Sequence, residues 1–320
     1  MLQTPLAEPM SNTFPLVSVV MATYNRAHTI KRAIDSVLNQ TYTNFELIII
    51  DDGSTDNTSE VLNEYKEPKI RIYKHEVNKG VAAAKNSGLR EIKGAWFTIL
   101  DSDDEMVPHA IATMINIPLS VDEAVTAVTC NCFDTTTKTF SGKGLNESQY
   151  IDVKTLMTVC DGEFWGITKS SLLQGDLLNE KLGIESILWY KVDDRANRYY
   201  IHEALRIYHT EGTDRISKWK YNFKAEVKFY QNLAEENFFL ETFRKYRPAQ
   251  YKNFCRKGLI VMRASSNKQI ALKYYELSRL QAKSTVNTLI YKFKVASLLF
   301  KQLLIFKNWL KHFVSLFMRK

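Results

Sequence analysis

The feature that most constrains this chain is an alternation of short apolar runs and amphipathic stretches over its first hundred residues. The apolar runs are rich in β-branched residues, which is typical of strands buried on both faces of a parallel sheet. They lie at residues 16–22, 46–52, 69–75 and 95–101. The stretches between them carry apolar residues at helical spacing, as at 30–38 and 82–92. This order predicts an α/β fold in which helices cover both faces of a doubly wound, mostly parallel sheet.

Three polar segments follow the predicted strands, each at the point where a strand ends. They are ATYNR (22–26), DDGS (51–54) and DSDD (101–104). Because ligands of such sheets bind at the carboxyl ends of the strands, we expect the three segments to form one site.

The DSDD segment places the carboxylates of Asp101, Asp103 and Asp104 side by side at the end of an apolar run. Their repulsion is costly unless a cation lies among them. Oxygen ligands of this kind suit Mg²⁺ or Mn²⁺, held together with phosphate oxygens. The alternative is a solvated acidic turn that caps the next helix.

The DDGS segment offers Asp51 and Asp52, whose carboxylates can accept hydrogen bonds from a base N–H or a ribose hydroxyl. The alternative is a turn in which Ser54 and Asp56 cap the following helix. Both interpretations are compatible with the sequence.

Taken together, these segments resemble glycosyltransferase family 2, inverting enzymes of the bacterial surface-polysaccharide type with the GT-A fold. The match also includes SVLNQTY (36–42) and NKGVAAAKNSGL (78–89), and it covers about the first third of the chain. The resemblance implies a Rossmann-like, mostly parallel sheet flanked by helices, followed here by a C-terminal helical region.

The resemblance also assigns roles to individual residues. Those implied to bind a nucleotide-sugar are Ala22, Thr23, Tyr24, Arg26, Asp52, Lys85, Asp101 and Asp103. Those implied to bind Mn²⁺ or Mg²⁺ are Asp103, Asp104 and His209. An ordinary surface position for Arg26, a helix-packing role for Lys85 and a structural role for His209 are the alternatives. Arg215 could face the diphosphate.

The general base is where the chain departs from the family. Members commonly carry a Glu-Asp pair whose Asp is the base, and Glu185 and Ser186 stand at those positions. A serine hydroxyl is no base near neutral pH, so Glu185 is the expected base, with Asp161 and Glu163 as reserves. Glu185 could instead cap the helix that holds Trp189, and a further alternative is a weak or altered enzyme.

The C-terminal third differs in character, because strand signals vanish and Lys and Arg become frequent after a boundary near residue 216. We expect a flexible lead (1–15), a catalytic domain (16–215) and a helical region (216–320). Residues 284–320 interleave seven Lys or Arg with aromatic and aliphatic residues and contain no Asp or Glu. This predicts a helix lying on an anionic membrane; the alternative is a helix packed on its own domain. Nucleic acid is a poorer match.

The location of the protein follows from absent signals. The first 15 residues lack the cationic start and apolar core of a secretory signal. No run reaches the roughly 18 apolar residues of a spanning helix. The four cysteines have no paired spacing, which favours free thiols. We expect a cytoplasmic protein, peripheral on the inner face of the cell membrane.

The resulting hypothesis is an enzyme that transfers one sugar, with inversion, from a nucleotide-sugar donor to a lipid-linked or surface-polysaccharide acceptor. A UDP-sugar is the family's commonest donor. The chain lacks the QxxRW segment of processive synthases, which favours single additions. The alternative is a non-catalytic nucleotide-sugar-binding or scaffold protein with a degenerate base site.

Overall fold

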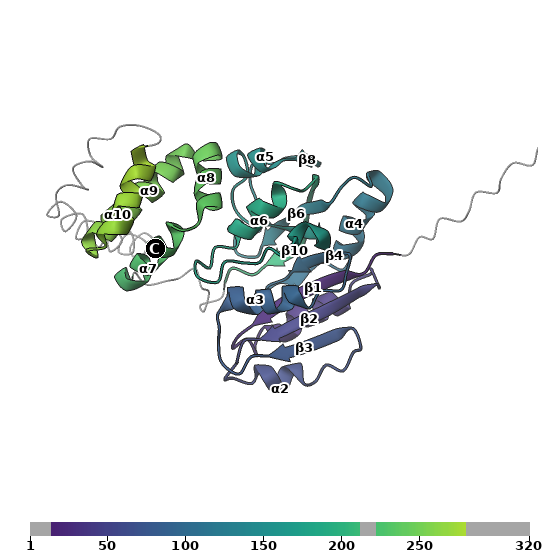
Figure 1. Cartoon of the computed structure of the whole chain (residues 1–320). Coiled ribbons are helices and arrows are strands. Elements are labelled where there is room, and N and C mark those ends of the chain that lie inside the picture. Colours follow the sequence, from purple (N-terminus) through teal and green to yellow (C-terminus); the bar gives the residue numbers. More distant parts are fainter. Residues whose placement is uncertain (1–13, 212–221, 280–320) are drawn as a thin grey trace, which may run out of the picture. The chain divides into compact units, whose positions relative to one another are not determined.

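A computed structural model describes residues 14–211 and 222–279 of the chain (Figure 1). The chain divides into two compact units. The first comprises the residues up to 152 together with 161–177 and 195–210, and the second comprises 153–160, 178–194 and the residues from 211 onward. The expected boundary near 216, Arg215 and the basic segment 284–320 lie outside the described residues, as does most of the expected lead, so these expectations stay predictions.

The first unit is built on a ten-stranded mixed sheet in the order β3-β2-β1-β4-β9-β6-β10-β5, in which β7 also pairs with β6 and β8 with β10. The strands are β1 (Val17–Thr23), β2 (Phe45–Asp51), β3 (Ile70–Lys74), β4 (Trp96–Ile99), β5 (Glu105–Met106), β6 (Ala127–Asp134), β7 (Thr139–Phe140), β8 (Gln149–Ile151), β9 (Phe164–Lys169) and β10 (Arg198–Tyr208). The fold class expected from the sequence is confirmed.

The N-terminal half of this sheet is the predicted parallel one. Strand β1 pairs in parallel with β2 and β4, and β2 pairs in parallel with β3. Every residue of β1 and β2 is buried, as expected for strands covered on both faces. In the register of β1 and β2, Thr23 lies beside Asp51, so the polar segments that follow these strands meet at one edge. The other half is mixed, because β9 runs antiparallel to both β4 and β6.

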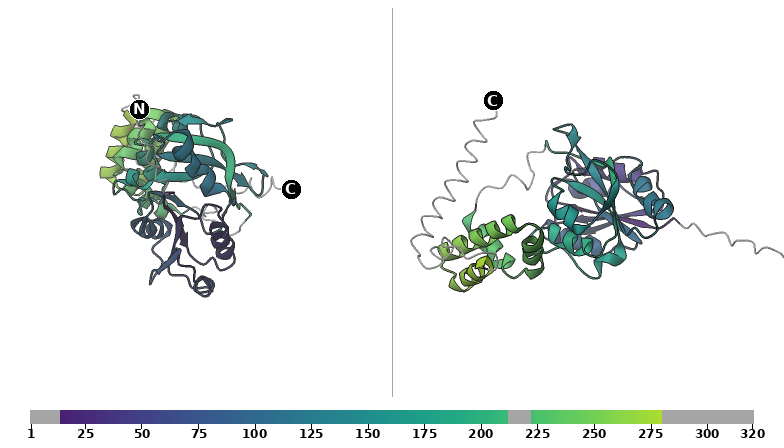
Figure 2. Two further views of the ribbon diagram at one scale, coloured as in Figure 1. Left: turned by 90° about the vertical axis from the view of Figure 1, so that its right-hand side faces the viewer. Right: turned by 90° about the horizontal axis from the view of Figure 1, so that it is seen from above.

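Helices lie on both sides of this sheet (Figures 1 and 2). They are α1 (Ile30–Leu38), α2 (Thr58–Leu62), α3 (Val81–Arg90) and α4 (Ala110–Asn116), with a π-helical turn at Ile117–Val121 and a 3₁₀ turn at Ser170–Leu173. The apolar faces of α1 and α4 share one core with the β1 residues Val17, Val19 and Met21. Helix α3 packs on the opposite face, where a Cβ on Gly88 would lie 2.4 Å from Val20 Cγ1. Gly88 therefore permits the close approach that places α3 at the sheet.

The second unit is helical within the described residues. Its helices are α5 (Val153–Thr158), α6 (Ser186–Asp193), α7 (Phe223–Leu233), α8 (Asn237–Tyr246), α9 (Pro248–Ala264) and α10 (Lys268–Arg279). Met157 of α5 and Ile187 of α6 belong to the same core as the C-terminal helices. Arg247 ties α5 and the turn after it to them, because its Nε donates to the carbonyl oxygen of Met157 and its Nη2 donates to that of Cys160 at 3.0 Å. Two segments that precede β10 in the chain thus pack with the helices that follow it.

Two expectations about the whole chain can be compared with the described residues. All four cysteines are free and buried, as the spacing of the cysteines indicated. No helix among residues 14–211 and 222–279 combines the length and the apolar character needed to cross a bilayer.

Candidate active site

The loops after β1 and β2 are joined by hydrogen bonds at the carboxyl edge of the sheet. Asn25 adopts a left-handed conformation with φ 53°, and its side-chain oxygen accepts from the N–H of Thr55 at 2.8 Å. Ser54 Oγ accepts from the N–H of Asn25 at 3.0 Å, and Asp56 Oδ2 accepts from the N–H of Ala27 at 3.2 Å. Ser54 and Asp56 therefore connect the two loops. Asp56 also has the expected capping contact, because its Oδ1 accepts from the N–H of Thr58, the first residue of α2, at 3.0 Å, although the N-cap position itself is Asn57.

The first of these loops carries the residues implied to hold a nucleotide base. Ala22 and Thr23 are buried at the end of β1, whereas Tyr24 exposes 40% of its surface. The hydroxyl of Thr23 is buried and has no hydrogen-bond partner among the described residues. Arg26 follows, half-buried. The strand end thus offers an aromatic side chain to solvent, which suits a planar ligand, whereas the unsatisfied hydroxyl of Thr23 is itself buried.

Asp52, the acid implied to contact the base, is buried and bound by the protein itself. One of its oxygens, Oδ1, lies 2.6 Å from His75 Nδ1 and accepts from the N–H of Lys79 at 2.9 Å. The other, Oδ2, accepts from the N–H of Gly80 at 2.8 Å. Gly53 makes this possible, because it has φ 73° and a Cβ there would lie 2.8 Å from the Val77 backbone carbon. In this structure Asp52 fixes the loop before α3; its contact with a base stays a prediction.

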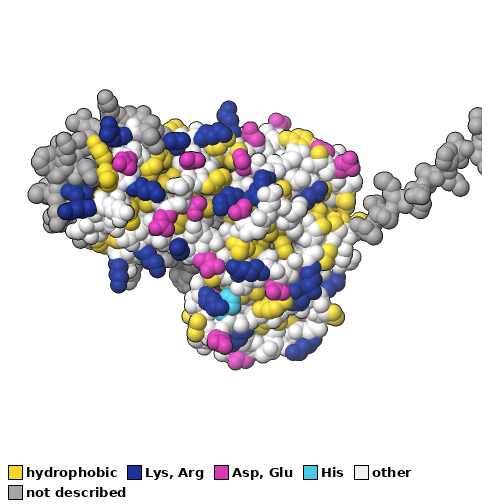
Figure 3. Space-filling model, viewed as in Figure 1, with side chains coloured by type: hydrophobic (Ala, Val, Ile, Leu, Met, Phe, Trp, Pro, Cys, Tyr) yellow, Lys and Arg dark blue, Asp and Glu magenta, His cyan; other side chains and the backbone are white. Residues whose placement is uncertain are grey.

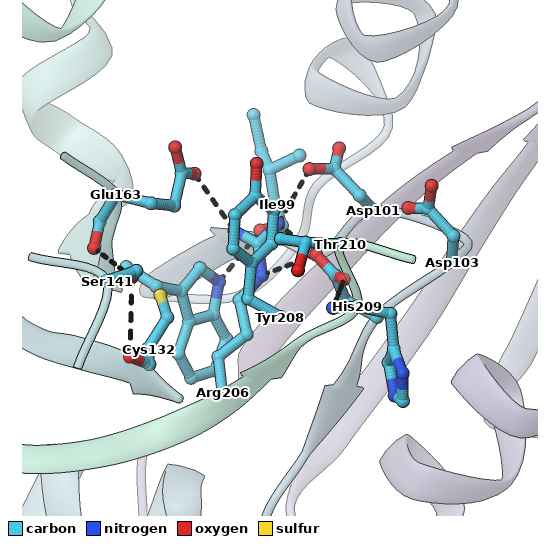
Figure 4. Close-up of polar contacts among 12 residues, drawn as sticks. Ile99, Asp101, Asp103, Cys132, Ser141, Glu163, Arg206, Tyr208, His209 and Thr210 are labelled. Atoms are coloured by element: carbon cyan, nitrogen blue, oxygen red, sulfur yellow. Dashed lines mark hydrogen bonds and ion pairs between the residues drawn. The ribbon is translucent and has the colours of Figure 1, made fainter. Parts of the chain in front are cut away.

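Arg206 of β10 lies among the carboxylates of the acidic segment (Figure 4). Its Nε donates to Asp104 Oδ2 at 2.8 Å, and its Nη2 donates to Asp101 Oδ2 at 2.8 Å and also contacts Asp104. Its Nη1 lies 3.4 Å from Glu163 Oε1. Lys85 of α3 adds a second cation, with Nζ 2.8 Å from Asp101 Oδ1. The expected crowding of acids is real, but protein cations neutralise part of it.

These contacts change the proton affinities of the network. Burial acts to raise the pKa of Asp101, but the charges of Lys85 and Arg206 outweigh it and hold that pKa well below its usual range. Burial raises the pKa of Asp104 to about 6, and the neighbouring Asp101 and Asp103 add to this against the pull of Arg206. For Arg206, burial acts to lower the pKa, and Asp101 and Asp104 reverse the effect. Arg206 is therefore a permanent cation in the sheet edge.

Asp103 differs from its neighbours. Its backbone oxygen accepts from Nη2 of Arg32 at 2.6 Å, which fixes the peptide. No side chain or backbone N–H among the described residues contacts its carboxylate, and Figure 4 shows Asp103 and Asp101 pointing to the same side of the loop. Within residues 14–211 and 222–279, Asp103 is thus the acid of this segment whose carboxylate has no protein partner.

A divalent cation fits the described residues through the carboxylate of Asp103. The described residues contain no group of three or more His, Cys, Asp or Glu side chains able to hold a metal by themselves. Mg²⁺ and Mn²⁺ in nucleotide sites are commonly held by one or two carboxylates plus phosphate oxygens, and the free Asp103 carboxylate matches that mode. Asp104 does not match it, because it is 1% exposed and both of its oxygens accept protein hydrogen bonds.

His209, implied as a further metal ligand, is tied to the acidic segment in another way. Its backbone N–H donates to Asp104 Oδ1 at 2.9 Å, and its Nε2 lies 2.7 Å from Glu105 Oε1. In Figure 4 its ring points away from the carboxylates of Asp101 and Asp103. These contacts favour the structural interpretation of His209 in this geometry.

The candidates for the base lie in different places. Glu163 precedes β9, and Figure 4 shows its carboxylate on the other side of Arg206 from Asp101. Asp161 pairs through its backbone with Lys143. Glu185 belongs to the second unit, at the N-cap of α6. Its role as base stays a prediction, and Glu163 is the candidate in direct contact with the acidic network.

Comparison with known proteins identifies the class. Residues 18–174 match the family model described as Glycosyl transferase family 2. A Campylobacter jejuni protein named GalNAc(5)-diNAcBac-PP-undecaprenol beta-1,3-glucosyltransferase is 34% identical over 213 residues, which cover 63% of this chain and 67% of that protein. The chain belongs to glycosyltransferase family 2 and is a member of a transferase family.

Two further similarities bear on the range of the match. An Escherichia coli protein named UDP-Glc:alpha-D-GlcNAc-diphosphoundecaprenol beta-1,3-glucosyltransferase WfgD is 40% identical over 104 residues, 32% of this chain and 41% of that protein. The crystal structure of S. aureus TarS 1-349 matches 88% of this chain and 87% of its own, with a TM-score of 0.60 and 16% identity. At that identity the likeness concerns the fold. The chain aligns with about two thirds of the Campylobacter protein and less than half of the Escherichia coli protein.

Proposed function

We propose that this chain transfers a single sugar, with inversion, from a UDP-sugar to an acceptor linked through diphosphate to a polyprenol. The observation that carries the proposal is the acidic segment at the end of β4, in which one carboxylate, that of Asp103, is left available beside an exposed Tyr24 loop. Family membership supports the transfer of a sugar from a nucleotide donor. The names of the relatives motivate undecaprenyl-diphosphate acceptors and UDP-glucose as the first substrates to test.

The residues of this chain would divide the work as follows. Tyr24 would contact the base, and Asp103 would face the diphosphate, while the buried Thr23 would support the strand end below Tyr24. A divalent cation held by Asp103 and the diphosphate, Mn²⁺ or Mg²⁺, would supply Lewis-acid stabilisation of the leaving UDP. Lys85 and Arg206 bind the carboxylates of Asp101 and Asp104. They leave the carboxylate of Asp103 to the cation.

The acceptor hydroxyl must lose a proton as it attacks the anomeric carbon. Glu185 is the base implied by family resemblance, and Glu163 is the acid in contact with the Arg206 network. Either carboxylate would take the proton, while the departing UDP takes the electron pair of the broken glycosidic bond. General-base catalysis contributes typically about 10²–10⁴-fold, so replacing the true base by Gln should lower turnover on that order while leaving donor binding intact.

Transfer of radiolabelled sugar tests the proposal directly. Purified protein, Mn²⁺ and a panel of UDP-sugars should label a synthetic polyprenyl-diphosphate glycan, with release of UDP. The rival function, a non-catalytic nucleotide-sugar-binding or scaffold protein, is favoured by Ser186 at the position of the usual Asp base. If the protein binds UDP-sugars but neither transfers nor hydrolyses any sugar of the panel, the non-catalytic function is the correct one.

We also propose that the C-terminal third holds the enzyme at an anionic membrane surface. Residues 222–279 carry twelve Lys or Arg against five Asp or Glu, and 284–320 carry seven against none. On the face shown in Figure 3, the basic side chains of the described residues are spread among acidic ones, so this face shows no separate patch of positive charge. The acid-free segment 284–320 is therefore the part to test.

Flotation with vesicles tests this second proposal. The full chain should float with phosphatidylglycerol vesicles, float less with phosphatidylcholine vesicles, and bind less strongly at high salt. A chain ending at residue 279 should lose flotation and keep donor hydrolysis. Equal flotation of the two chains would show that membrane binding does not depend on residues 280–320. Loss of folding on truncation would favour the alternative in which this segment packs on its own domain.

A further inference from the structure

The buried Arg206 joins carboxylates that come from distant parts of the chain. Asp101 and Asp104 follow β4, Glu163 precedes β9, and all three contact the one guanidinium. Arg206 itself is 3% exposed. A buried guanidinium is stable only where its donors are paired. Its five donors lie on three nitrogens in one plane and reach oxygens in fixed directions, whereas the three donors of a lysine lie on a single nitrogen.

The charges around it do not balance. Among the described residues, three carboxylates, those of Asp101, Asp104 and Glu163, contact the two cations Lys85 and Arg206. A third cation, Arg32, contacts the backbone oxygen of Asp103 and the carboxylate of Glu105. Lys85 and Arg206 bind the carboxylates of Asp101, Asp104 and Glu163, not that of Asp103. None of the ion pairs of this region, as far as the structure describes the chain, includes the carboxylate of Asp103, so a cationic ligand would be attracted there.

Strand β10, which carries Arg206, is irregular just before this residue. The parallel pairing of β10 with β6 shifts register between Ile201 and Ala204 and again between Ala204 and Arg206. Such irregularities re-aim side chains and are common beside active sites. Here they bring Arg206 under the acidic segment, and the N–H of His209, three residues on, completes the binding of Asp104.

We propose that Arg206 is a positioning residue, which holds Asp101 and Asp104 at the sheet edge so that Asp103 alone presents its carboxylate to the diphosphate of the donor and its cation. The inference rests on the proposed function for the identity of the ligand. Arg206 does not touch the donor. It acts through the loop that it fixes, and the geometry requires a guanidinium rather than any positive charge.

Three variants test this. Arg206→Lys keeps the charge and removes the fork. Arg206→Met combined with Asp104→Asn removes both buried charges, so that neither is left unpaired. Arg71→Lys is the matched control, because Arg71 also bridges two carboxylates of this unit, with nitrogens 2.7 Å from Glu46 and 3.3 Å from Glu91.

Hydrogen exchange of the ligand-free protein gives the first readout. Arg206→Lys should speed exchange at least tenfold in the peptides that cover 100–106, and Arg71→Lys should leave those peptides as in the wild type. This readout needs no donor. It therefore tests the positioning role even if the wild type binds no UDP, a result that would overturn the proposed function and not this inference.

The second readout is the affinity for UDP, measured by calorimetry at saturating Mn²⁺. Arg206→Lys and the double variant should bind UDP at least tenfold more weakly than the wild type, while their thermal unfolding stays cooperative. Arg71→Lys should bind UDP as the wild type does. Wild-type exchange at 100–106 in Arg206→Lys would overturn the inference, and so would wild-type UDP affinity in the folded double variant.

Discussion

At the scale of single residues, the local sequence indicates which groups are chemically unusual but not which of them are already paired. Asp101, Asp103 and Asp104 stand out in the sequence as one acidic group. The structure separates them, because Arg206, more than a hundred residues further on, binds two and leaves the third. Nothing in the residues around position 206 marks it as a partner of the acids.

Tyr24 carries a prediction at this scale. Tyr24 is 40% exposed directly after β1, where a nucleotide base is proposed to stack on its ring. Stacking of a base on an aromatic side chain contributes about 1–3 kcal/mol, so Tyr24→Ala should weaken UDP by at least about fivefold. Tyr24→Phe should bind as the wild type does.

Tyr150, 51% exposed in the same unit, supplies the control for this measurement. Tyr150→Ala should leave UDP affinity unchanged in the same calorimetric titration. An unchanged affinity for Tyr24→Ala would place the base elsewhere on the sheet edge.

At the scale of elements, Glu46 shows how a buried charge ties strands together. Its Oε1 accepts from Ser18 Oγ at 2.6 Å and from the N–H of Lys93 at 2.8 Å, and its Oε2 lies 2.7 Å from Arg71. Burial acts to raise the pKa of Glu46, but these hydrogen bonds and the charge of Arg71 outweigh it and lower the pKa. The carboxylate therefore stabilises the fold above the ordinary Glu pKa, and this contribution is lost as the pH falls through the lowered one.

Glu46→Gln should thus cost about 1 kcal/mol or more at pH 7, which lowers the Tm by about 2–4 °C. The difference from the wild type should shrink as the pH falls below about 4. The exposed Glu123→Gln is the control and should change the Tm at neither pH. A difference between wild type and Glu46→Gln that is as large at pH 3 as at pH 7 would contradict the linkage.

The elements that sequence patterns predicted and those that they missed differ in physical character. Strands β1 to β4 are continuous apolar runs, and the helices between them have clear periodicity, so the parallel half of the sheet follows from the sequence. Strand β10 does not alternate, because register shifts put buried residues next to each other, and two of its buried residues are arginines. Strands β5 and β7 have two residues each, too few for any pattern.

At the scale of the whole molecule, the predicted change of character near residue 216 lies outside the described residues, and the two compact units are interleaved along the chain. Residues 153–160 and 178–194 group with the C-terminal helices, whereas 195–210 return to the sheet. Such an exchange depends on packing between distant segments, for which a local composition shift carries no signal. It also separates Glu185 from Glu163, the two leading candidates for the base, between the two units.

The cysteines give a prediction that involves both units. Cys130 and Cys132 lie in the first, Cys160 and Cys255 in the second, and all are buried. Burial raises the pKa of Cys132 to about 12 and that of Cys255 to about 11, and it also raises those of the other two. Because the thiolate is the reactive form, the native protein should show no fast reaction with a thiol reagent at pH 8.

Four thiols should react at once when the chain is unfolded in guanidinium, and this serves as the internal standard. A fast phase of one thiol or more in the native protein would show that the packing of the corresponding unit is looser than described.

The central claim is that Asp103 is the carboxylate through which this site binds the donor and its cation. Its most direct test is UDP affinity measured by calorimetry with Mn²⁺ and with EDTA, for the wild type, Asp103→Asn and the exposed-acid control Glu147→Gln. We predict that EDTA weakens UDP at least tenfold in the wild type and in Glu147→Gln, and that Asp103→Asn binds as weakly with Mn²⁺ as the wild type does with EDTA. Mn²⁺-dependent affinity that survives in Asp103→Asn would contradict the account.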